Sequence, residues 1–347
     1  GVFYFCTMQR LLASLLFVCF FCSVAFASKN QVDSNYIKDF TQQYTFKLFG
    51  IQKYTRLHIT EKFGDLTHSF YPNEQTDLGF GFNYKWLGVA LTVNPNRSRN
   101  VETLGETKKL DLQLFSYGRK FGFDVNISRY QGFYLNNPDE LGVKWDRVHY
   151  PLRPDINTNH TEFNWFYVRN HEKFSYRAAF TQNEEQKKTA GSLIFGAFAG
   201  NTGIRSVLGL QTILLEDLVN NTQQLRGGNF NFIGGGAGYA GTLTHKGGFY
   251  GTLSFFVGLS AQSSALERLN GEKINEFRLR SRSNTRLSLG YNHKAFFAGV
   301  SGIIVNRVLH NGQFYEVENE TGQFRFFVGR RFNWRPIHIS VPLLDRT

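Results

Sequence analysis

The sequence has few of the residues that usually cross-link a secreted protein. Its three cysteines are Cys6, Cys19 and Cys22, and its only methionine is Met8. The chain beyond residue 22 therefore has no thiol for a disulfide framework, thiol catalysis or a thiolate metal site. This composition fits an oxidising bacterial envelope better than an animal exterior, where secreted domains more often carry disulfides.

Long apolar runs are also scarce, and the longest one, 11–27, lies close to Met8. It ends on Ala25-Phe26-Ala27, which has small residues at the two positions that a signal peptidase reads. We expect residues 1–7 to be upstream sequence, 8–27 a signal peptide, and 28–42 a periplasmic N-terminal segment. The alternative is a retained membrane anchor, which needs about 20 apolar residues. Lipid attachment is disfavoured because bulky residues precede Cys19 and Cys22.

Proline is rare, with 7 residues, whereas the chain holds 36 Phe, 16 Tyr and 34 Gly. A protein with a negative mean hydropathy would not usually carry so many Phe residues if it were soluble. The combination suits a wall whose two faces meet different solvents. A transmembrane β-barrel is such a wall, apolar outside and polar inside. No window past Ala27 approaches the length of a membrane-spanning helix.

Alternating polarity supports strands. Between 121 and 128 all four odd residues are apolar and the even ones are glycine or polar, and 249–260 repeats the pattern. A soluble β-sandwich also alternates, but its two apolar faces must meet. The connections between the predicted strands are of two kinds, short links and long polar segments. An outer-membrane barrel has its short turns at one rim and its long loops at the other. The predicted long loops include 132–160, 261–275 and 311–320.

The strand count follows from this sorting. We expect a single all-β domain, an antiparallel transmembrane β-barrel of about 12 to 14 strands, over residues 43–332, with 333–347 as a periplasmic tail. Phe174–Gln182 is one of the predicted strands. Alternation of strand direction between the turns at Arg119 and His245 then requires an extra crossing between Thr202 and Gly209. Leu210–Asn220 is predicted as a short amphipathic helix. Gln43–Ile51 fits either a barrel strand or a segment that crosses the lumen.

The final predicted strand, Gly322–Phe332, resembles the assembly signal of outer-membrane barrels, with its glycine and closing aromatic. Other stretches resemble a Bacteroidota family of outer-membrane proteins classed as domain of unknown function 4421. They include 71–81 (YPNEQTDLGFG), 84–88 (YKWLG), 117–122 (YGRKFG), 130–134 (YQGFY), 153–155 (RPD), 174–180 (FSYRAAF) and 186–192 (QKKTAGS). The resemblance spans most of the chain beyond the signal peptide and implies an outer-membrane barrel. It lends no activity and no catalytic residues.

Two short motifs admit an enzymatic interpretation. Gly236, Gly238 and Gly241 have the spacing of a dinucleotide-binding loop, but that loop needs a helix after it and the sequence continues as a strand. Glycines that allow curvature or close contact in a barrel wall are the favoured explanation. His338 and Ser340 have the spacing of an outer-membrane phospholipase pair, but they follow the last strand, so chance is favoured. The histidines form no motif of metal-ligand spacing.

A row of arginines is the strongest candidate site. Arg278, Arg280, Arg282 and Arg286 share one face of a predicted strand, and Arg177 and Arg325 are predicted on the lumen face of other strands. An arginine facing lipid costs roughly 2–4 kcal/mol near the bilayer midplane. The row therefore faces the lumen or stands above the membrane. Removing Arg10 leaves a net charge of about +11.

Two interpretations of the row remain open. One is an anion-preferring passage or a site for an acidic ligand. The other is an internal ion-pair network with acids such as Asp111, Asp124 and Glu276 in a closed lumen, or outer arginines that grip lipopolysaccharide phosphates.

The functional expectation is a non-enzymatic outer-membrane barrel without cofactor or metal. It acts as a porin-like passage or as the membrane component of an envelope assembly. The predicted loop 132–160 would form a constriction or a docking surface. Expected partners are outer-membrane lipid, lipopolysaccharide and other envelope proteins, and the location excludes nucleic acid. The alternative is a lipid hydrolase or acyltransferase that uses residues at the lumen rim.

Overall fold

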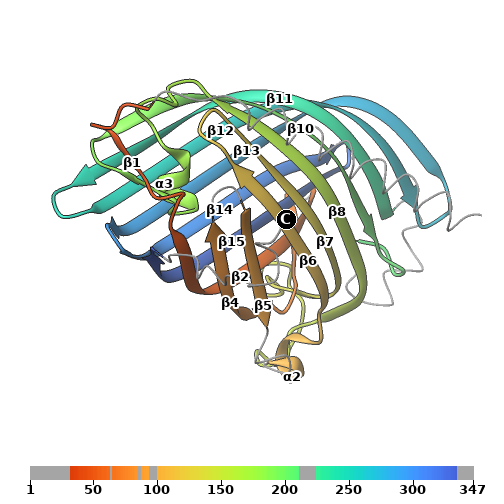
Figure 1. Cartoon of the computed structure of the whole chain (residues 1–347). Coiled ribbons are helices and arrows are strands. Elements are labelled where there is room, and N and C mark those ends of the chain that lie inside the picture. The colour runs from red at the N-terminus through yellow and green to blue at the C-terminus, as the bar shows by residue number, and fades with distance from the viewer. Residues whose placement is uncertain (1–31, 63–64, 85–86, 94–99, 211–223, 334–347) are drawn as a thin grey trace, which may run out of the picture.

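The computed structural model describes residues 32–333 except 63–64, 85–86, 94–99 and 211–223. Thirteen strands form one antiparallel sheet that curls into a barrel (Figure 1). They are β2 (Tyr44–Glu61), β3 (Leu66–Tyr71), β4 (Thr76–Tyr84), β5 (Leu87–Val93), β6 (Lys108–Tyr117), β7 (Phe121–Leu135), β8 (Leu152–Val168), β10 (Ala190–Arg205), β11 (Leu225–His245), β12 (Phe249–Arg268), β13 (Lys273–His293), β14 (Phe296–Asn311) and β15 (Tyr315–Phe332). A short helix, α2 (Val101–Leu104), lies between β5 and β6.

The barrel closes because the first long strand pairs with the last. The ladder between β2 and β15 runs without a break from Tyr44↔Phe332 to Glu61↔Tyr315. Gln43–Ile51, which the sequence did not place, therefore lies almost wholly in a wall strand. β3 completes a ring of ten strands by pairing with β7 at Phe70↔Leu135 and Tyr71↔Tyr134. β4 continues along β2 beyond β3, β5 pairs with β4, and β6 pairs with β7.

The wall is apolar outside and polar inside. On β12, Leu253, Phe255, Val257 and Leu259 are 50–61% exposed, while the alternating Thr252, Ser254 and Ser260 are at most 5% exposed. A soluble sandwich would bury the apolar face. The predicted transmembrane β-barrel is thus confirmed.

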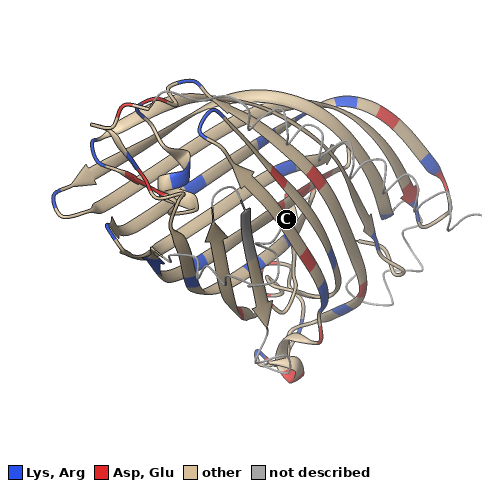
Figure 2. Cartoon of the chain, viewed as in Figure 1, with Lys and Arg blue, Asp and Glu red and all other residues tan. Residues whose placement is uncertain are grey.

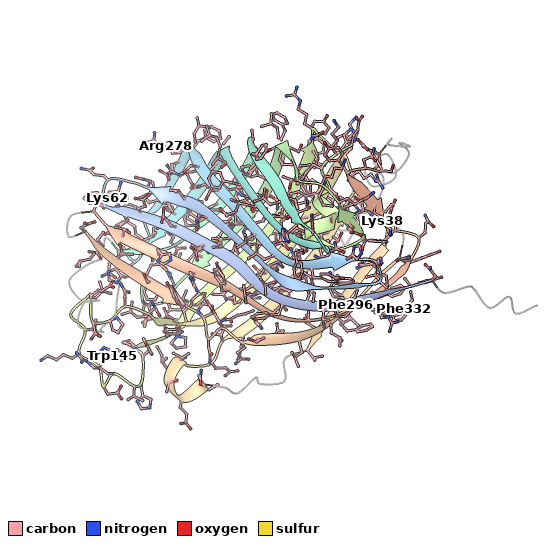
Figure 3. All side chains as sticks on the ribbon, turned by 90° about the vertical axis from the view of Figure 1, so that its left-hand side faces the viewer. Lys38, Lys62, Trp145, Arg278, Phe296 and Phe332 are labelled. Atoms are coloured by element: carbon pink, nitrogen blue, oxygen red, sulfur yellow. The ribbon has the colours of Figure 1, made fainter. Side chains whose placement is uncertain are left out.

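The barrel has two distinct rims. The terminal rim holds the start of β2 and the end of β15, and Figure 3 shows Lys38, Phe296 and Phe332 there. The loop rim lies at the opposite end, where Lys62, Trp145 and Arg278 are found.

The prediction of long loops at 261–275 and 311–320 is wrong. β12 and β13 extend almost to a turn at 269–272, and β14 and β15 extend to a turn at 312–314. Both segments are rich in polar residues, so their composition alone did not distinguish these strand ends from loops. The segment between β7 and β8 is a loop, but it spans only 136–151.

The predicted strand Phe174–Gln182 is also wrong. Residues 169–189 fold inward at the terminal rim and contain α3 (Tyr176–Phe180) and β9 (Glu184–Gln186), which pairs with β1 (Ile37–Asp39). Ser175 caps α3, because its side chain accepts a hydrogen bond from the Ala178 amide (3.0 Å). Since this segment does not cross the wall, no extra crossing at Thr202–Gly209 is required, and β10 simply continues to Arg205.

Clusters of buried apolar side chains lie toward both ends of the lumen. At the loop rim, Leu57, Phe70, Ile156, Phe230 and Leu309 belong to one buried cluster, against which Leu141 and Val143 of the 136–151 loop pack. Toward the terminal rim two smaller clusters are built around Phe174 and Tyr176 and around Phe49 and Phe297. Between these ends lies a polar layer.

Several predictions fall outside the described residues. They are the signal peptide at 8–27, all but the first residue of the 210–220 helix, and His338 and Ser340 in the C-terminal tail. Within the described ranges, no helix is long and apolar enough to cross a bilayer.

Candidate functional site

Three arginines of β13 project into the lumen. Arg280, Arg282 and Arg286 are 9%, 6% and 7% exposed, whereas their neighbours Leu279 and Leu287 face outward. Strand alternation fixes this arrangement, because the three arginines stand at even spacings on one face. Arginines buried in this way need acidic or hydrogen-bonding partners.

Glu162 on β8 is the central partner. Its carboxylate is 1% exposed and accepts from Arg282 Nη2 at 2.8 Å and from Arg307 Nε at 2.9 Å. Asn164 donates a further hydrogen bond of 2.6 Å. Arg282 lies on β13 and Arg307 on β14, so one carboxylate joins β8 to two strands that are not its ladder neighbours.

Asp124 on β7 is the second partner, also 1% exposed. It accepts from Arg286 Nη2 at 2.7 Å and from the Tyr117 hydroxyl at 2.6 Å. The Tyr117 oxygen in turn accepts from Arg286 Nη1 at 2.7 Å. The three side chains therefore form a closed hydrogen-bonded triangle that joins β6, β7 and β13.

Two further ion pairs join β6 to β2 and β4, which lie near it on the same side of the barrel. Lys53 of β2 lies 2.5 Å from Asp111, which also accepts from the Tyr130 hydroxyl at 2.8 Å. Lys109 lies 3.0 Å from Asp77 of β4. Figure 2 shows the acidic positions partway along the front strands β6 to β8. We call the residues of these two ion pairs, together with those around Glu162 and Asp124, the lumen charge layer. Its members are Lys53, Asp77, Lys109, Asp111, Tyr117, Asp124, Tyr130, Glu162, Asn164, Arg282, Arg286 and Arg307.

A cavity of about 80 Å³ lies within the lumen charge layer. Its walls include Lys53, Asp111, Asp124, Glu162, Arg282, Arg286 and Arg307. A polar space of this size accommodates several water molecules. Each of these carboxylates is held by a cation, so none is poised as a free general base. Within the described part of the chain, no group of three His, Cys, Asp or Glu residues is arranged to hold a metal ion.

The other predicted site residues do not share this layer. Arg280 pairs with Glu276 of its own strand at 3.0 Å. Arg278 is exposed near the loop rim (Figure 3). Arg325 of β15 lies over the ring of Phe49, with its guanidinium carbon 4.9 Å from the ring centre.

Arg177 is not on a barrel strand, contrary to the prediction. It lies in α3 and pairs with the buried Glu184 at 3.3 Å. Arg119 also approaches Glu184, at 3.1 Å. Arg177 therefore stabilises the inward segment at the terminal rim rather than lining a barrel wall.

The inward segment is held by hydrogen bonds from wall side chains to its main chain. Ser288 donates to the Ala179 carbonyl at 2.9 Å, and Asn292 donates to the Ala178 carbonyl at 3.1 Å. Arg331 donates to the Gln182 carbonyl, and Lys47 donates to the Gln182 side chain at 2.6 Å. This segment is thus fixed across the terminal end of the lumen.

Sequence reasoning missed Glu162 and Arg307. A local signal existed for Glu162, since His160, Glu162 and Asn164 alternate with the outward aromatic residues Phe163, Trp165 and Tyr167. The glycine motif at 236–241 lies inside β11, where no helix follows. A Cβ at Gly236 or Gly238 would collide with main-chain oxygens of β12, which explains the glycines by close strand contact.

Fold and interior together define a transmembrane β-barrel whose lumen contains a layer of paired charges. The chain belongs to the family "Domain of unknown function (DUF4421)", whose model matches residues 31–332. The comparison with curated proteins finds no match.

Solved structures with a similar fold include the outer membrane protease OmpT from Escherichia coli, with 8% identity, 84% of this chain and 97% of that chain covered, and a TM-score of 0.35. Another is the translocator domain of the autotransporter NalP from Neisseria meningitidis, with 9% identity, 82% and 88% covered, and a TM-score of 0.33. The toluene transporter TodX from P. putida has 9% identity, 90% and 92% covered, and a TM-score of 0.27. Likenesses this distant do not bear on function.

Proposed function

We propose that this protein is a closed, non-enzymatic β-barrel of the outer membrane of a Gram-negative bacterium of the Bacteroidota type, and that it serves as the membrane component of an envelope assembly. The observation that carries the proposal is the set of ion pairs that cross the lumen between the apolar clusters toward its two ends. Glu162 and Asp124 link opposite strands through Arg282, Arg307 and Arg286. Apolar clusters occupy both ends.

An anion-preferring passage is the less favoured function for the same barrel. A selective lining needs cations that are free to meet a passing anion. Arg280, Arg282 and Arg286 are instead each paired with a carboxylate at 3.0 Å or less. The inward segment with α3 also lies across the terminal end.

The loop rim supplies the surface for partners in this proposal. Outer-membrane barrels place their short turns in the periplasm, so the terminal rim faces the periplasm and the 136–151 loop faces outward. This loop is ordered by its own contacts, since Trp145 donates to Asp139 at 2.9 Å. Hydrogen bonds from the His149 side chain and amide lower the pKa of Asp146 to about 2. Lipopolysaccharide and other envelope proteins are the proposed partners, and nucleic acid is not.

An enzyme that acts on lipids is the remaining candidate, and the geometry gives it little support. The buried carboxylates of the lumen charge layer are bound by arginine or lysine, so they are poor general bases. Purified protein is expected to leave phospholipid and lipopolysaccharide unchanged. Release of fatty acid by the folded protein, measured by mass spectrometry, would restore this candidate.

Single-channel recording in planar bilayers tests the proposed closure. Refolded protein, verified by its heat-dependent migration in gels, is expected to insert without stepwise conductance. The matched variant carries Arg280, Arg282 and Arg286 changed to Ser, which removes three buried side chains and should produce small, irregular steps. Regular anion-selective steps from the unchanged protein would contradict the proposal and favour the passage.

A further inference from the structure

The outer surface of the wall changes polarity along β8 and β11. Toward the terminal rim the outward side chains are apolar, such as Trp165 and Ile233, which are 38% and 67% exposed. Toward the loop rim the outward side chains are polar, as at Asn159 and Asn231, while the inward Phe230 is 1% exposed. A polar surface over an apolar interior is the pattern of a sheet that faces water. In the proposed membrane location, the loop-rim part of these strands therefore extends beyond the hydrocarbon.

The polar outward residues of this part form one continuous surface. The ladders that join β6, β7, β8, β10 and β11 place them side by side. Most of them carry an amide, three carry a positive charge, and none is acidic. We call this surface the outer basic face, and its members are Lys108, Arg129, Gln131, Asn157, Asn159, Thr161, Asn201, Arg205, Asn229 and Asn231.

The outer basic face adjoins an apolar surface on the same strands. The change takes place within two residues on three neighbouring strands, and the pairs are Thr161 and Phe163 on β8, Asn201 and Ala199 on β10, and Asn231 and Ile233 on β11. The three apolar residues are ladder partners of one another, as are the three polar ones. In a transmembrane barrel such a boundary marks the level where lipid headgroups meet the wall.

Two arginines of the outer basic face lie on either side of β8. Arg129 of β7 and Arg205 of β10 are exposed and form no ion pair among the described residues. Two strand spacings, roughly 10 Å, separate their strands. The amides of β8 lie between them, and the Asn159 side chain covers Gly203, where a Cβ would collide with it. One ligand with phosphate and hydroxyl groups can therefore contact both arginines and the amides together.

The opposite charge is found elsewhere on the loop-rim part of the wall. On β15 the outward residues are Glu316, Glu318 and Glu320, which alternate with the inward Val317 and Asn319. The positive charge is therefore not a general property of the outer surface. It is concentrated over β6 to β10, directly beyond the apolar surface, where an anionic headgroup would lie.

We propose that the outer basic face binds the phosphorylated sugar headgroup of lipopolysaccharide. Arg129 and Arg205 donate charge-assisted hydrogen bonds to phosphate. The amides exchange hydrogen bonds with sugar hydroxyls, because an amide offers both donors and an acceptor. The acyl chains lie along the apolar surface beside Phe163, Trp165 and Ile233. The inference rests on the proposed outer-membrane location but not on the proposed closure.

Lipid binding by the purified protein tests the face. Native mass spectrometry of the detergent-solubilised protein compares diphosphoryl lipid A, the phosphorylated sugar anchor of lipopolysaccharide, with the same lipid A after removal of both phosphates. We expect the diphosphoryl form to bind about tenfold more tightly, a difference that one charge-assisted contact can supply. The double variant Arg129→Gln with Arg205→Gln should lose this preference and bind the dephosphorylated form as the unchanged protein does.

The matched control is the double variant Arg169→Gln with Arg330→Gln. It removes two exposed arginines from the terminal rim, so the change in net charge is the same. It should retain the preference of the unchanged protein. Equal binding of the two lipid A forms, or equal loss in both double variants, would overturn the proposal. Heat-dependent gel migration confirms that each variant is folded.

Competition separates the glycolipid from other sources of phosphate. Inorganic phosphate lacks acyl chains, and phosphatidylglycerol lacks the phosphorylated sugars, so neither in excess is expected to displace diphosphoryl lipid A. Complete displacement by either would overturn the glycolipid as the ligand. Asn159→Ala with Asn231→Ala should weaken both lipid A forms about threefold, since neutral hydrogen bonds to the sugars are lost. Unchanged binding of both forms would contradict the role of the amides.

The conductance experiment is independent of lipid binding. A conducting barrel that prefers diphosphoryl lipid A would refute closure alone. A silent barrel without this preference would refute the outer basic face alone.

Discussion

Two buried cations at the terminal end of the lumen, Lys47 and Arg331, are held differently from the arginines in the middle. In the middle, Arg282 and Arg307 share the carboxylate of Glu162. At the terminal end, Lys47 and Arg331 form no ion pair in the described residues. They donate instead to neutral groups of Gln182, and both lie over the ring of Phe297.

This difference separates two tasks. An arginine paired with an acid on a distant strand joins parts of the wall, so it contributes to the stability of the whole barrel. A cation that binds main-chain carbonyls holds the inward segment in place, so its loss should act locally. The following changes test this division, beginning with the largest expected effect.

Glu162→Ala should be the most damaging single substitution. It leaves Arg282 and Arg307 buried without their carboxylate, and breaking a buried ion pair in this way costs about 3–5 kcal/mol. The free energy of unfolding in urea, measured in detergent or vesicles, reports the loss. Glu162→Gln, which retains oxygen and volume, should cost less. If Glu162→Ala were as stable as the unchanged protein, the ion pairs of Glu162 would not contribute to the stability of the barrel.

Asp124 and Arg286 should show strong coupling. Asp124→Leu alone should lower the free energy of unfolding by about 3 kcal/mol, because Arg286 is left unpaired. The double variant Asp124→Leu with Arg286→Met should recover much of that loss, since apolar pairs often replace buried ion pairs without cost. Additive losses in the double-mutant cycle would argue against a direct pair.

Arg331→Met should act mainly on the inward segment. Its hydrogen bonds to the Gln182 carbonyl and to Asn292 are charge-assisted, and such bonds contribute about 1.5–3 kcal/mol each. Hydrogen exchange of residues 174–186 should accelerate, while β8 and β13 remain protected. Arg330→Met is the control because Arg330 faces outward. Uniform acceleration through the barrel would contradict the local role.

Lys109→Ala should have the smallest effect. Its ion pair with Asp77 is partly exposed, with side-chain exposures of 23% and 13%, and such pairs contribute about 0–1 kcal/mol. A shift in the urea midpoint as large as that of Glu162→Ala would show that the contact between β4 and β6 is essential to closure.

The sequence predicted the wall well because alternation is a local property. The outward leucines and inward arginines of β13 follow from strand geometry alone. The acid that pairs with each arginine could not be predicted, since Glu162 is 120 residues from Arg282 and the contact depends on how the barrel closes. The 174–182 error has a similar origin, because its apolar residues pack inside the lumen and not against lipid. Because strand directions must alternate, the wrongly predicted strand led to the wrong prediction of a crossing at 202–209.

Thiol accessibility tests the closed lumen most directly. A chain that begins at Ser28 contains no natural cysteine, so Asn284→Cys places a single thiol at the cavity of the lumen charge layer. Asn270→Cys, in the exposed turn between β12 and β13, is the reference. With a charged, membrane-impermeant thiol reagent, a closed lumen gives rapid modification at 270 and none at 284 until the barrel is unfolded. Equal rates at both positions would show that the lumen is open.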